Sequence, residues 1–465
     1  MNILLVEPNF PYPNKSKNKA NQVHKNFVPI ALLKFAALHK AKRDKVKLIR
    51  GKITRGDIGF VPDEIYVTSI FTYWSSYVWD CLSYYRQLYP HALIRLGGIY
   101  ATLHSDKQKF RFLTKKFKVL VYKGINQEAE KYSPDYSVLP PVDYHATHMM
   151  RGCIRKCNFC GTWKLEPERT NKSKDEIINE LTKIGKTKVI FYDNNILANP
   201  NIKEILKEFI NFRVDGKPVI FESQSGFDGR LLEKNPELAN LIRKARFQNV
   251  RIAWDNGLED KYSVRKQVDI LIKAGYAPKD ISIFMIYNFV IPYEDMLKKI
   301  KSCRERGVQI TDCRYRPLDI DYDNYNPHMR DGQLSGSYYI HEKTGWTDEK
   351  IRDFRSKVRK HNIWVRYAKD KGKEYDNKME KWSAINNTYK FFNLGRPPHM
   401  EQIEKSKYLQ SKIRLLNKIK SICKSNNLNE KNLVSYSIDE LEKIVNEYEN
   451  QDQIQTLQNQ EICLV

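Results

Sequence analysis

The stretch Cys153-Ile154-Arg155-Lys156-Cys157-Asn158-Phe159-Cys160 places three cysteines within eight residues, directly after a candidate strand at Tyr144–Met149. Thiolates are soft ligands that suit zinc or iron–sulfur clusters. A structural zinc site uses a fourth protein ligand, but no histidine lies close downstream of Cys160. An iron–sulfur cluster held by Cys153, Cys157 and Cys160 would instead keep one iron open for a substrate. The spacing therefore predicts a cluster site at the end of a strand.

Outward from this motif, residues 144–340 repeat strand and helix. One helix is clearly bounded: Ser173 and Glu176 form a capping box, Lys174–Ile184 has apolar residues at helical spacing, and Gly185 is a stop signal. Six strand–helix units predict a partial (β/α)6 barrel, in which chemistry takes place at the carboxyl ends of the strands. The six candidate strands are Tyr144–Met149, Lys188–Tyr192, Val219–Ser223, Asn249–Trp254, Ser282–Asn288 and Gln309–Arg314.

The regions on either side have different patterns. Residues 1–143 alternate strands and helices, which predicts a doubly wound, Rossmann-like parallel sheet. Residues 341–465 lose the strand pattern and are predicted to be helical, with a tail that frays from about Glu447. The predicted fold class is therefore α/β, with three domains that meet at about residues 143 and 340. Candidate strands of the first region are Ile3–Val6, Val46–Ile49, Glu64–Ile70 and Leu93–Leu96.

Composition limits the class of protein. A hydrophobic fraction of 41% indicates a folded chain. No stretch approaches ~18 consecutive apolar residues, and the first residues carry no basic segment or cleavage site of a secretory signal, so we expect a cytoplasmic protein without a membrane span. The net charge of +25 is compatible with a nucleic acid or another anionic partner. The lysines are spread along the whole chain, however, and the composition of an AT-rich genome explains them better than a nucleic-acid site does.

In this context the cysteine motif resembles the signature of the radical S-adenosylmethionine (SAM) superfamily, with Phe159 in the aromatic position before the last cysteine. The resemblance implies that a 4Fe–4S cluster binds the amino and carboxylate groups of SAM through its open iron. It also implies that a reductant such as flavodoxin or ferredoxin delivers one electron. SAM is then cleaved to methionine and a 5′-deoxyadenosyl radical, which abstracts hydrogen from a substrate that the sequence does not identify.

The candidate strands end in polar residues that would contact SAM. By resemblance to the second strand of the family, Asp193 is expected to accept the SAM amino group; a helix cap or a turn is the structural alternative for this residue. Arg314 and Arg316 alternate along the last strand, so only one of them is expected to point inward and bind a carboxylate. The further candidates are Asn194, Gln224, Asp255 and Asn256, of which Asp255 and Asn256 offer partners for the ribose hydroxyl groups.

The first region resembles the cobalamin-binding domain that is fused to many radical SAM enzymes. Ser69, Gly97 and Gly98 occupy the positions that approach the nucleotide tail of the corrin in those relatives. The motif Asp-x-His-x-x-Gly, which supplies the lower histidine ligand, is missing, because the loop after the first strand reads Glu7-Pro8-Asn9-Phe10. The resemblance therefore implies either cobalamin without a histidine ligand or a domain that serves only as a scaffold.

These alternatives imply different reactions. With cobalamin, we expect methyl transfer to an unactivated carbon. Without it, the radical would drive a rearrangement, a cyclisation or a coupling, or would modify a nucleic acid or its precursor. A third class of protein, a zinc- or cluster-containing nucleic-acid binding module without catalysis, is disfavoured by the open coordination site and by the barrel strands that follow it. The sequence assigns no side chain to the hydrogen-abstraction step itself.

Overall fold

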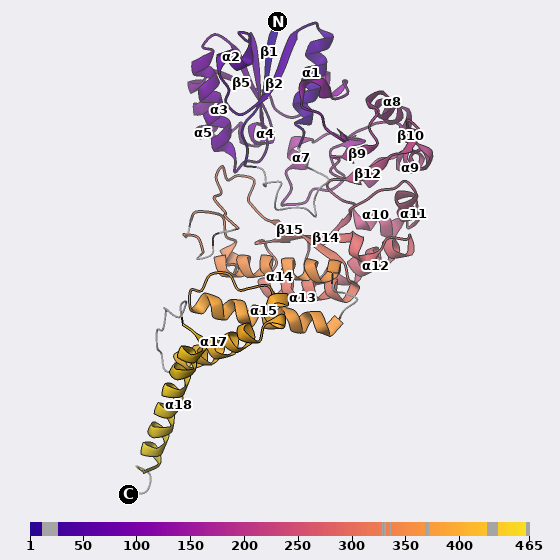
Figure 1. The fold of residues 1–465 in the computed structure, drawn as a ribbon. Coiled ribbons are helices and arrows are strands. Elements are labelled where there is room, and N and C mark those ends of the chain that lie inside the picture. The colour runs from indigo at the N-terminus through magenta and orange to yellow at the C-terminus, as the bar shows by residue number, and fades with distance from the viewer. Residues whose placement is uncertain are drawn as a thin grey trace. The chain divides into compact units, whose positions relative to one another are not determined.

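The computed structural model describes residues 1–11, 27–327, 329, 332–334, 336–367, 372–425 and 436–461 (Figure 1). The chain divides into two compact units, Met1–Val365 and Arg366–Val465. The strands of the described residues all lie in the first unit. None of the described helices is long and apolar enough to cross a membrane.

The N-terminal region forms a five-stranded, fully parallel sheet with the order β2-β1-β3-β4-β5. Alternation along β1 buries Ile3 and Leu5 on the face that packs against α1, and Leu4 and Val6 on the opposite face against α3. This is a doubly wound order, with its switch point between β1 and β3. The strands are β1 (Asn2–Glu7), β2 (Lys45–Arg50), β3 (Glu64–Ser69), β4 (Leu93–Gly98) and β5 (Val119–Val121).

The helices of this region connect its strands and cover both faces of the sheet (Figure 1). They are α1 (Ile30–Ala41), α2 (Arg55–Ile58), α3 (Ser75–Leu88), α4 (Ile99–His104), α5 (Gln108–Lys116) and α6 (Gln127–Glu130). The four strands that the sequence predicts here are confirmed. The short strand β5 was not predicted, because a run of three residues carries no alternation that could be recognised.

Six further parallel strands form two three-stranded sheets, with the orders β12-β9-β6 and β13-β14-β15. Isolated bridges between Phe221 and Phe247 and between Phe227 and Ile252 link the two sheets, and one hydrophobic core runs through both. All six predicted strands are confirmed. They are β6 (His145–Thr147), β9 (Lys188–Phe191), β12 (Ile220–Ser223), β13 (Val250–Ala253), β14 (Ile281–Tyr287) and β15 (Gln309–Arg314).

Helices follow these strands in chain order. The predicted helix Lys174–Ile184 is α8; Ser173 Oγ accepts the Glu176 amide at 3.3 Å, and Gly185 ends the helix with φ +66°. The other α-helices here are α7 (Thr162–Leu165), α9 (Ile202–Asn211), α10 (Gly229–Lys234), α11 (Glu237–Lys244), α12 (Lys261–Lys273), α13 (Tyr293–Arg306) and α14 (Asp348–Tyr367). Two short antiparallel strand pairs complete the region: β7 (Met150–Arg151) with β8 (Thr170–Asn171), and β10 (Arg213–Val214) with β11 (Lys217–Pro218).

Helix α14 belongs to the core of the first unit, because Ile351, Phe354 and Val358 are buried with the side chains of β13–β15. The second unit has a hydrophobic core of its own, which includes Phe392, Leu416 and Leu441. Its helices are α15 (Gly372–Phe391), α16 (Met400–Lys405), α17 (Lys407–Ser425) and α18 (Ile438–Glu461). Helix α18 continues past Glu447, where fraying was predicted, and residues 462–465 lie outside the described residues.

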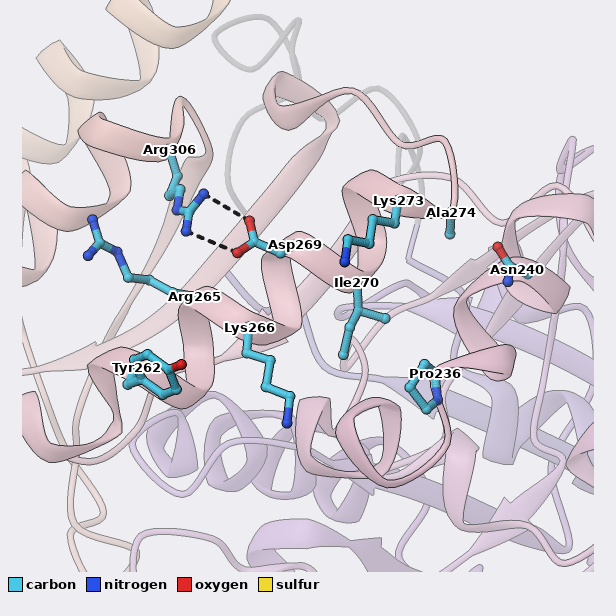
Figure 2. A pocket seen from close by; sticks show the side chains of 10 residues that line it. All are labelled: Pro236, Asn240, Tyr262, Arg265, Lys266, Asp269, Ile270, Lys273, Ala274 and Arg306. Carbon is cyan, nitrogen blue, oxygen red and sulfur yellow. Dashed lines mark hydrogen bonds and ion pairs between the residues drawn. The ribbon is translucent and has the colours of Figure 1, made fainter.

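A cavity of about 670 Å³ lies on the outer helices of the second group of strands (Figure 2). The ion pair between Arg306 and Asp269, at 2.9 Å, forms part of its wall. None of the residues that the sequence predicts for a functional site lines this cavity. The lining residues are Pro236, Asn240, Tyr262, Arg265, Lys266, Asp269, Ile270, Lys273, Ala274 and Arg306.

Candidate functional site

The three-cysteine motif lies in a loop that is closed at its base by two short strands. Strand β7 pairs with β8 in antiparallel fashion, and the loop runs between them. Gly152, the first loop residue, has φ +75°, and a Cβ atom there would lie 2.9 Å from the carbonyl oxygen of Glu168. Only glycine fits such a close approach at a positive φ. The residue before Cys153 is therefore fixed by the backbone geometry of the loop.

Each of the three cysteines is a free thiol and is partly exposed. The backbone amide of Arg155 donates to Cys153 Sγ at 3.3 Å, and that of Thr162 donates to Cys160 Sγ at 3.5 Å. Such donors favour a thiolate and tune the potential of a cluster bound to it. Among the described residues, no group of three or more His, Cys, Asp or Glu side chains lies close enough together to hold a single metal ion.

Asp193 lies beneath this loop and has no exposed surface. Its carboxylate accepts the backbone amide of Met150 at 2.6 Å and that of Met149 at 3.0 Å. Burial raises the pKa of Asp193 to about 7, against these two amide donors, which lower it. The structure thus places Asp193 under the start of the cysteine loop and away from any open surface. Asn194 is exposed and donates to Glu166 Oε2 at 3.3 Å.

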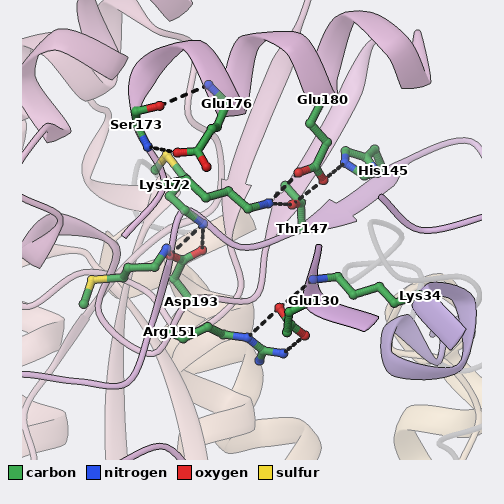
Figure 3. A network of polar contacts seen from close by, with 12 residues as sticks. Lys34, Glu130, His145, Thr147, Arg151, Lys172, Ser173, Glu176, Glu180 and Asp193 are labelled. Atoms are coloured by element: carbon green, nitrogen blue, oxygen red, sulfur yellow. Dashed lines mark hydrogen bonds and ion pairs between the residues drawn. The ribbon is translucent and has the colours of Figure 1, made fainter. Parts of the chain in front are cut away.

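A chain of alternating charges leads from helix α1 to the start of the loop (Figure 3). Lys34 Nζ contacts Glu130 Oε2 at 2.7 Å, and Arg151 Nη2 contacts Glu130 Oε1 at 2.6 Å. Arg151 Nη1 also lies 3.0 Å from Glu166 Oε1, while the other oxygen of Glu166 accepts the Gly152 amide at 2.6 Å. Burial opposes the charge of Glu130, yet Arg151 and Lys34 hold its pKa below the usual range.

Sequence reasoning missed this chain of charges. The sign of it in the sequence was Lys34, a lysine on the apolar face of a helix. In the structure Lys34 is 2% exposed. A second polar group lies behind strand β6, where Glu180 accepts hydrogen bonds from Thr147 Oγ1 at 2.6 Å and from Lys172, and pairs with His145 Nε2 at 2.9 Å (Figure 3). Both groups connect the backbone before the cysteines to neighbouring elements.

The loop after β13 brings one carboxylate toward the cysteines. Asp255 is partly exposed and has no hydrogen-bond partner among the described residues. Burial raises its pKa to about 6, against the nearby charges of Lys299 and Arg230. The pKa of Cys157 is raised first by burial and then by the negative charge of Asp255. The two side chains are therefore close enough to interact electrostatically. Asp255 is therefore an uncommitted acceptor beside the cysteine loop.

Two further residues lie at the carboxyl end of strand β13. Lys299 is fully buried and donates to the carbonyl oxygens of Trp254 at 2.8 Å and Asn256 at 2.6 Å, on either side of Asp255. The side chain of Asn256 is exposed and donates to Asp260 at 2.7 Å. Gln224 follows β12, and its Oε1 atom is buried without a partner among the described residues. Gln224 thus offers an amide oxygen, whereas Asn256 is already paired.

Asp228, which the sequence analysis did not single out, joins the loop to helix α10. Its carboxylate pairs with Arg155 Nε at 2.9 Å and with Arg230 Nε at 2.8 Å. It also accepts the Asn195 amide at 3.2 Å. Phe159, in the same loop, meets the ring of Phe289 edge-on at a centroid distance of 5.9 Å. The loop is therefore attached to the ends of several strands.

Strand alternation predicts that only one of Arg314 and Arg316 points inward to bind a carboxylate. Both reach the fully buried carboxylate of Asp323: Arg314 forms an ion pair with it, and Arg316 Nε lies 3.3 Å from Oδ1. Arg314 is the last residue of β15, and Arg316 lies beyond the strand next to Pro317, where strand alternation no longer applies. Arg314 is buried, and the guanidinium of Arg316 lies 4.2 Å from the ring centroid of Tyr73.

The three residues expected near a corrin tail are engaged within the N-terminal sheet. Ser69 Oγ donates to the Gly97 carbonyl at 2.7 Å and accepts the Ala101 amide at 3.0 Å. Gly98 has φ +102°, and a Cβ atom there would lie 2.0 Å from the Ser69 carbonyl oxygen. Gly97 is not so crowded, with its nearest contact at 3.9 Å. The contacts between β3, β4 and α4 explain why a serine stands at position 69 and a glycine at position 98, and neither residue requires a ligand.

Comparison with known proteins agrees with the cysteine motif. Residues 147–315 match the family model described as the Radical SAM superfamily. The chain therefore contains a radical SAM domain, which includes the cysteine loop and all six strands from the end of β6 to β15. No curated protein matches the sequence.

Solved structures give weaker likenesses. Methylornithine synthase (PylB) is 9% identical with a TM-score of 0.29, over 46% of this chain and 61% of the other. The carboxyl transferase domain of Rhizobium etli pyruvate carboxylase with pyruvate is 12% identical with a TM-score of 0.21, over 80% of this chain and 56% of the other. The matches thus span less than two thirds of the length of either solved chain.

Proposed function

We propose that this chain is a radical SAM enzyme whose cluster is held by Cys153, Cys157 and Cys160. The observation that carries the proposal is the loop itself, with three free, partly exposed thiols within a radical SAM domain. When bound, a 4Fe–4S cluster and SAM supply a 5′-deoxyadenosyl radical through one-electron reduction. The thiols fit such a cluster because soft thiolates are its ligands and because two of the three sulfurs already receive backbone N–H groups.

Two carboxylates next to the cysteine loop, those of Asp193 and Glu166, fix its backbone conformation. Asp193 holds the amides of Met149 and Met150, and Glu166 holds the amide of Gly152. We therefore assign Asp193 as a positioning residue and no longer as the acceptor for the SAM amino group, because both of its oxygens are occupied and buried. Arg151 and Glu130 fix Glu166 in turn, so the loop start is held by a continuous set of contacts.

Asp255 is the best-supported contact for SAM. Its acceptors are uncommitted among the described residues, and it is an electrostatic neighbour of Cys157. A carboxylate in this place would accept the ribose hydroxyl groups, with the Gln224 amide as a further polar contact, whereas Arg316 is already paired with Asp323. Asn194 and Asn256 are already bonded to Glu166 and Asp260 and contribute less. Phe159 would cover one side of the ligand from the loop.

The two three-stranded sheets would together form one open barrel, with the reacting atoms at the carboxyl ends of its strands. The bound cluster and SAM would supply a radical able to take hydrogen from a C–H bond of the substrate, and a flavodoxin- or ferredoxin-type protein would deliver the electron. Cobalamin-dependent methyl transfer does not fit the residues of the N-terminal sheet, because the Ser69 hydroxyl is bonded to Gly97 and Ala101 and Gly98 lies directly against the Ser69 backbone. We derive no step through cobalamin, and a rearrangement, cyclisation or coupling without it is the reaction type that we propose.

The test is the cleavage of SAM by anaerobically reconstituted protein. With dithionite and SAM but without substrate, the wild-type chain should slowly form 5′-deoxyadenosine and methionine in equal amounts, measured by liquid chromatography and mass spectrometry. A variant with Cys153, Cys157 and Cys160 all changed to Ala should form neither. Cys423→Ala, which changes a buried cysteine of the second unit, is the matched control and should behave as wild type. Equal product from the triple variant and the wild type would refute the proposal.

A further inference from the structure

In doubly wound sheets, ligands bind in the crevice outside the carboxyl ends of the strands, at the switch point. In this chain that edge is formed by the residues after β1, β3 and β4. Aromatic side chains close it at the switch point: the ring of Phe10, after β1, stacks on Trp74, after β3, at a centroid distance of 5.5 Å and an interplanar angle of 19°. Phe10 is only 4% exposed, so the space between the two loops is filled by protein.

The rest of this edge contacts a distant part of the same unit. The segment Pro317–Asp323, which follows strand β15, lies against the residues that come after β3. Trp74 and Tyr322 form an isolated antiparallel bridge. Next to it, Ser75 Oγ donates to the carbonyl oxygen of Asp321 at 2.5 Å. The segment is thus held here by one isolated bridge and one side-chain hydrogen bond, without adding a strand to the sheet.

The residues that follow β4 hold the same segment from the other side. His104 is 2% exposed, and its Nε2 atom lies 2.9 Å from the carbonyl oxygen of Leu318. Lys107 donates to the carbonyl oxygen of Asp319, and Lys109 Nζ lies 2.6 Å from Asp321 Oδ2. Three backbone carbonyl oxygens of the segment are therefore bound: that of Leu318 by His104, that of Asp319 by Lys107 and that of Asp321 by Ser75. The segment is therefore held through its backbone along most of its length.

The segment also carries the residues that fix the end of β15. Asp323, at its last position, is fully buried and binds both Arg314 and Arg316. Tyr73, from the same N-terminal loop as Trp74, lies against the guanidinium of Arg316. The N-terminal region thus contacts Arg316 directly through Tyr73, and it reaches both arginines through Asp323 of the bound segment.

We infer that the carboxyl edge of the N-terminal sheet is a binding site for the chain's own segment Pro317–Asp323, which occupies it in place of a cofactor. The N-terminal domain is then a clamp on the last barrel strand. A corrin would have to displace Trp74, Tyr322 and the contacts of His104, and it would find Ser69 already bonded to Gly97 and Ala101. This inference concerns the N-terminal sheet and goes beyond the cleavage of SAM.

The test uses the full chain with Trp74→Cys and Tyr322→Cys, because residues that face each other across an antiparallel bridge lie within reach of a disulfide. Oxidation should join the two cysteines, as shown by a linked peptide pair in mass spectrometry. The cross-linked protein, compared with the same preparation after reduction, should form 5′-deoxyadenosine at a rate within about twofold. Failure of the disulfide to form in folded protein, or loss of product that reduction restores, would overturn the inference, because the segment would then not remain in the crevice.

Cobalt binding by the unaltered chain is the second measurement, and it does not depend on whether the cysteine variant folds. After incubation with hydroxocobalamin and desalting, the wild-type protein should retain no cobalt, and hydrogen exchange in residues 317–323 should be the same with and without the corrin. Near-stoichiometric cobalt, or faster exchange in this segment, would contradict the clamp. If the reduced variant and the wild type both fail to cleave SAM while the disulfide forms and no cobalt binds, the proposed function fails and the clamp stands.

Discussion

The carboxylate of Asp193 accepts the backbone amide of Met150 at 2.6 Å, across the gap between the end of β9 and the start of the cysteine loop. Met150 is the third residue before Cys153, so this bond sets the direction in which the loop leaves the sheet that contains β6 and β9. The same carboxylate also accepts the amide of Met149. An acidic residue at a strand end, which would be expected to contact a ligand, instead organises the backbone that carries the cluster ligands.

Removal of this carboxylate should therefore damage the loop. Asp193→Ala leaves two buried amides without an acceptor, at a cost of about 1–3 kcal/mol for each. We expect a lower urea midpoint and fewer iron atoms per chain after reconstitution. Asp193→Asn, which keeps one acceptor oxygen, should lose less of both. If Asp193→Ala kept its stability and its iron but bound SAM weakly, the residue would be a ligand contact after all.

Asp255 should affect SAM and leave the cluster intact. Asp255→Asn removes a charged acceptor, and a hydrogen bond to a charged group contributes about 1.5–3 kcal/mol. The SAM dissociation constant, measured anaerobically by equilibrium dialysis on protein with full iron content, should therefore rise about tenfold or more. Asn256→Ala is the neighbouring control, because its side chain is exposed and bonded to Asp260. Equal affinities for Asp255→Asn and wild type would remove Asp255 from the SAM site.

The charge chain from Lys34 to Glu166 should be important for stability. Glu130→Gln leaves the buried Lys34 without its anion and leaves Arg151 with Glu166 alone, and loss of one partner of a buried ion pair costs about 3–5 kcal/mol. Urea unfolding should show a large fall in the free energy of unfolding. Glu128→Gln tests the alternative that any lost carboxylate has this effect, since Glu128 is exposed and pairs with Lys42 on the surface. That variant should change the free energy by less than about 0.5 kcal/mol.

Stability should also fall in mild acid because of His361. This side chain is 2% exposed, its Nε2 atom bonds to the Val308 carbonyl at 2.8 Å, and burial lowers its pKa from 6.5 to about 4. Between these two values the unfolded chain binds a proton that the folded chain does not bind, so the free energy of unfolding decreases as the pH falls through this window. The difference corresponds to about 3 kcal/mol. Urea titrations from pH 7 to pH 4 should show a smaller decrease for His361→Gln than for wild type.

Most of the strand framework could be predicted from local sequence. Each of the six strands from β6 to β15 in the two three-stranded sheets is a short apolar run that ends in turn or polar residues. Helix α8 has its capping box and its terminal glycine within the same stretch. The cysteine motif is equally local, because its meaning depends on spacing within one loop. The short strands β5, β7 and β8 escaped prediction because they contain too few residues to show a period.

Contacts between distant residues could not be predicted in the same way. Asp193 lies at the end of a strand, as expected, but its partners are backbone amides more than 40 residues earlier. Lys34 and Glu130 lie 96 residues apart, and no periodic pattern relates them. Arg314 and Arg316 were assigned from strand alternation, which ends where β15 ends, so their shared partner Asp323 was not foreseen. In each case the fold, and not the local spacing, selects the partner.

The most direct test of the central claim is the iron and acid-labile sulfide content of single-cysteine variants, together with electron paramagnetic resonance of the reduced protein. The wild-type chain should hold about four iron and four sulfide per molecule, and its reduced signal should change when SAM is added. Cys153→Ala, Cys157→Ala and Cys160→Ala should each lose most of the iron and the SAM-dependent change, while Cys423→Ala keeps both. Full iron and an unaltered SAM response in any one of the three loop variants would contradict the assignment of the cluster to this loop.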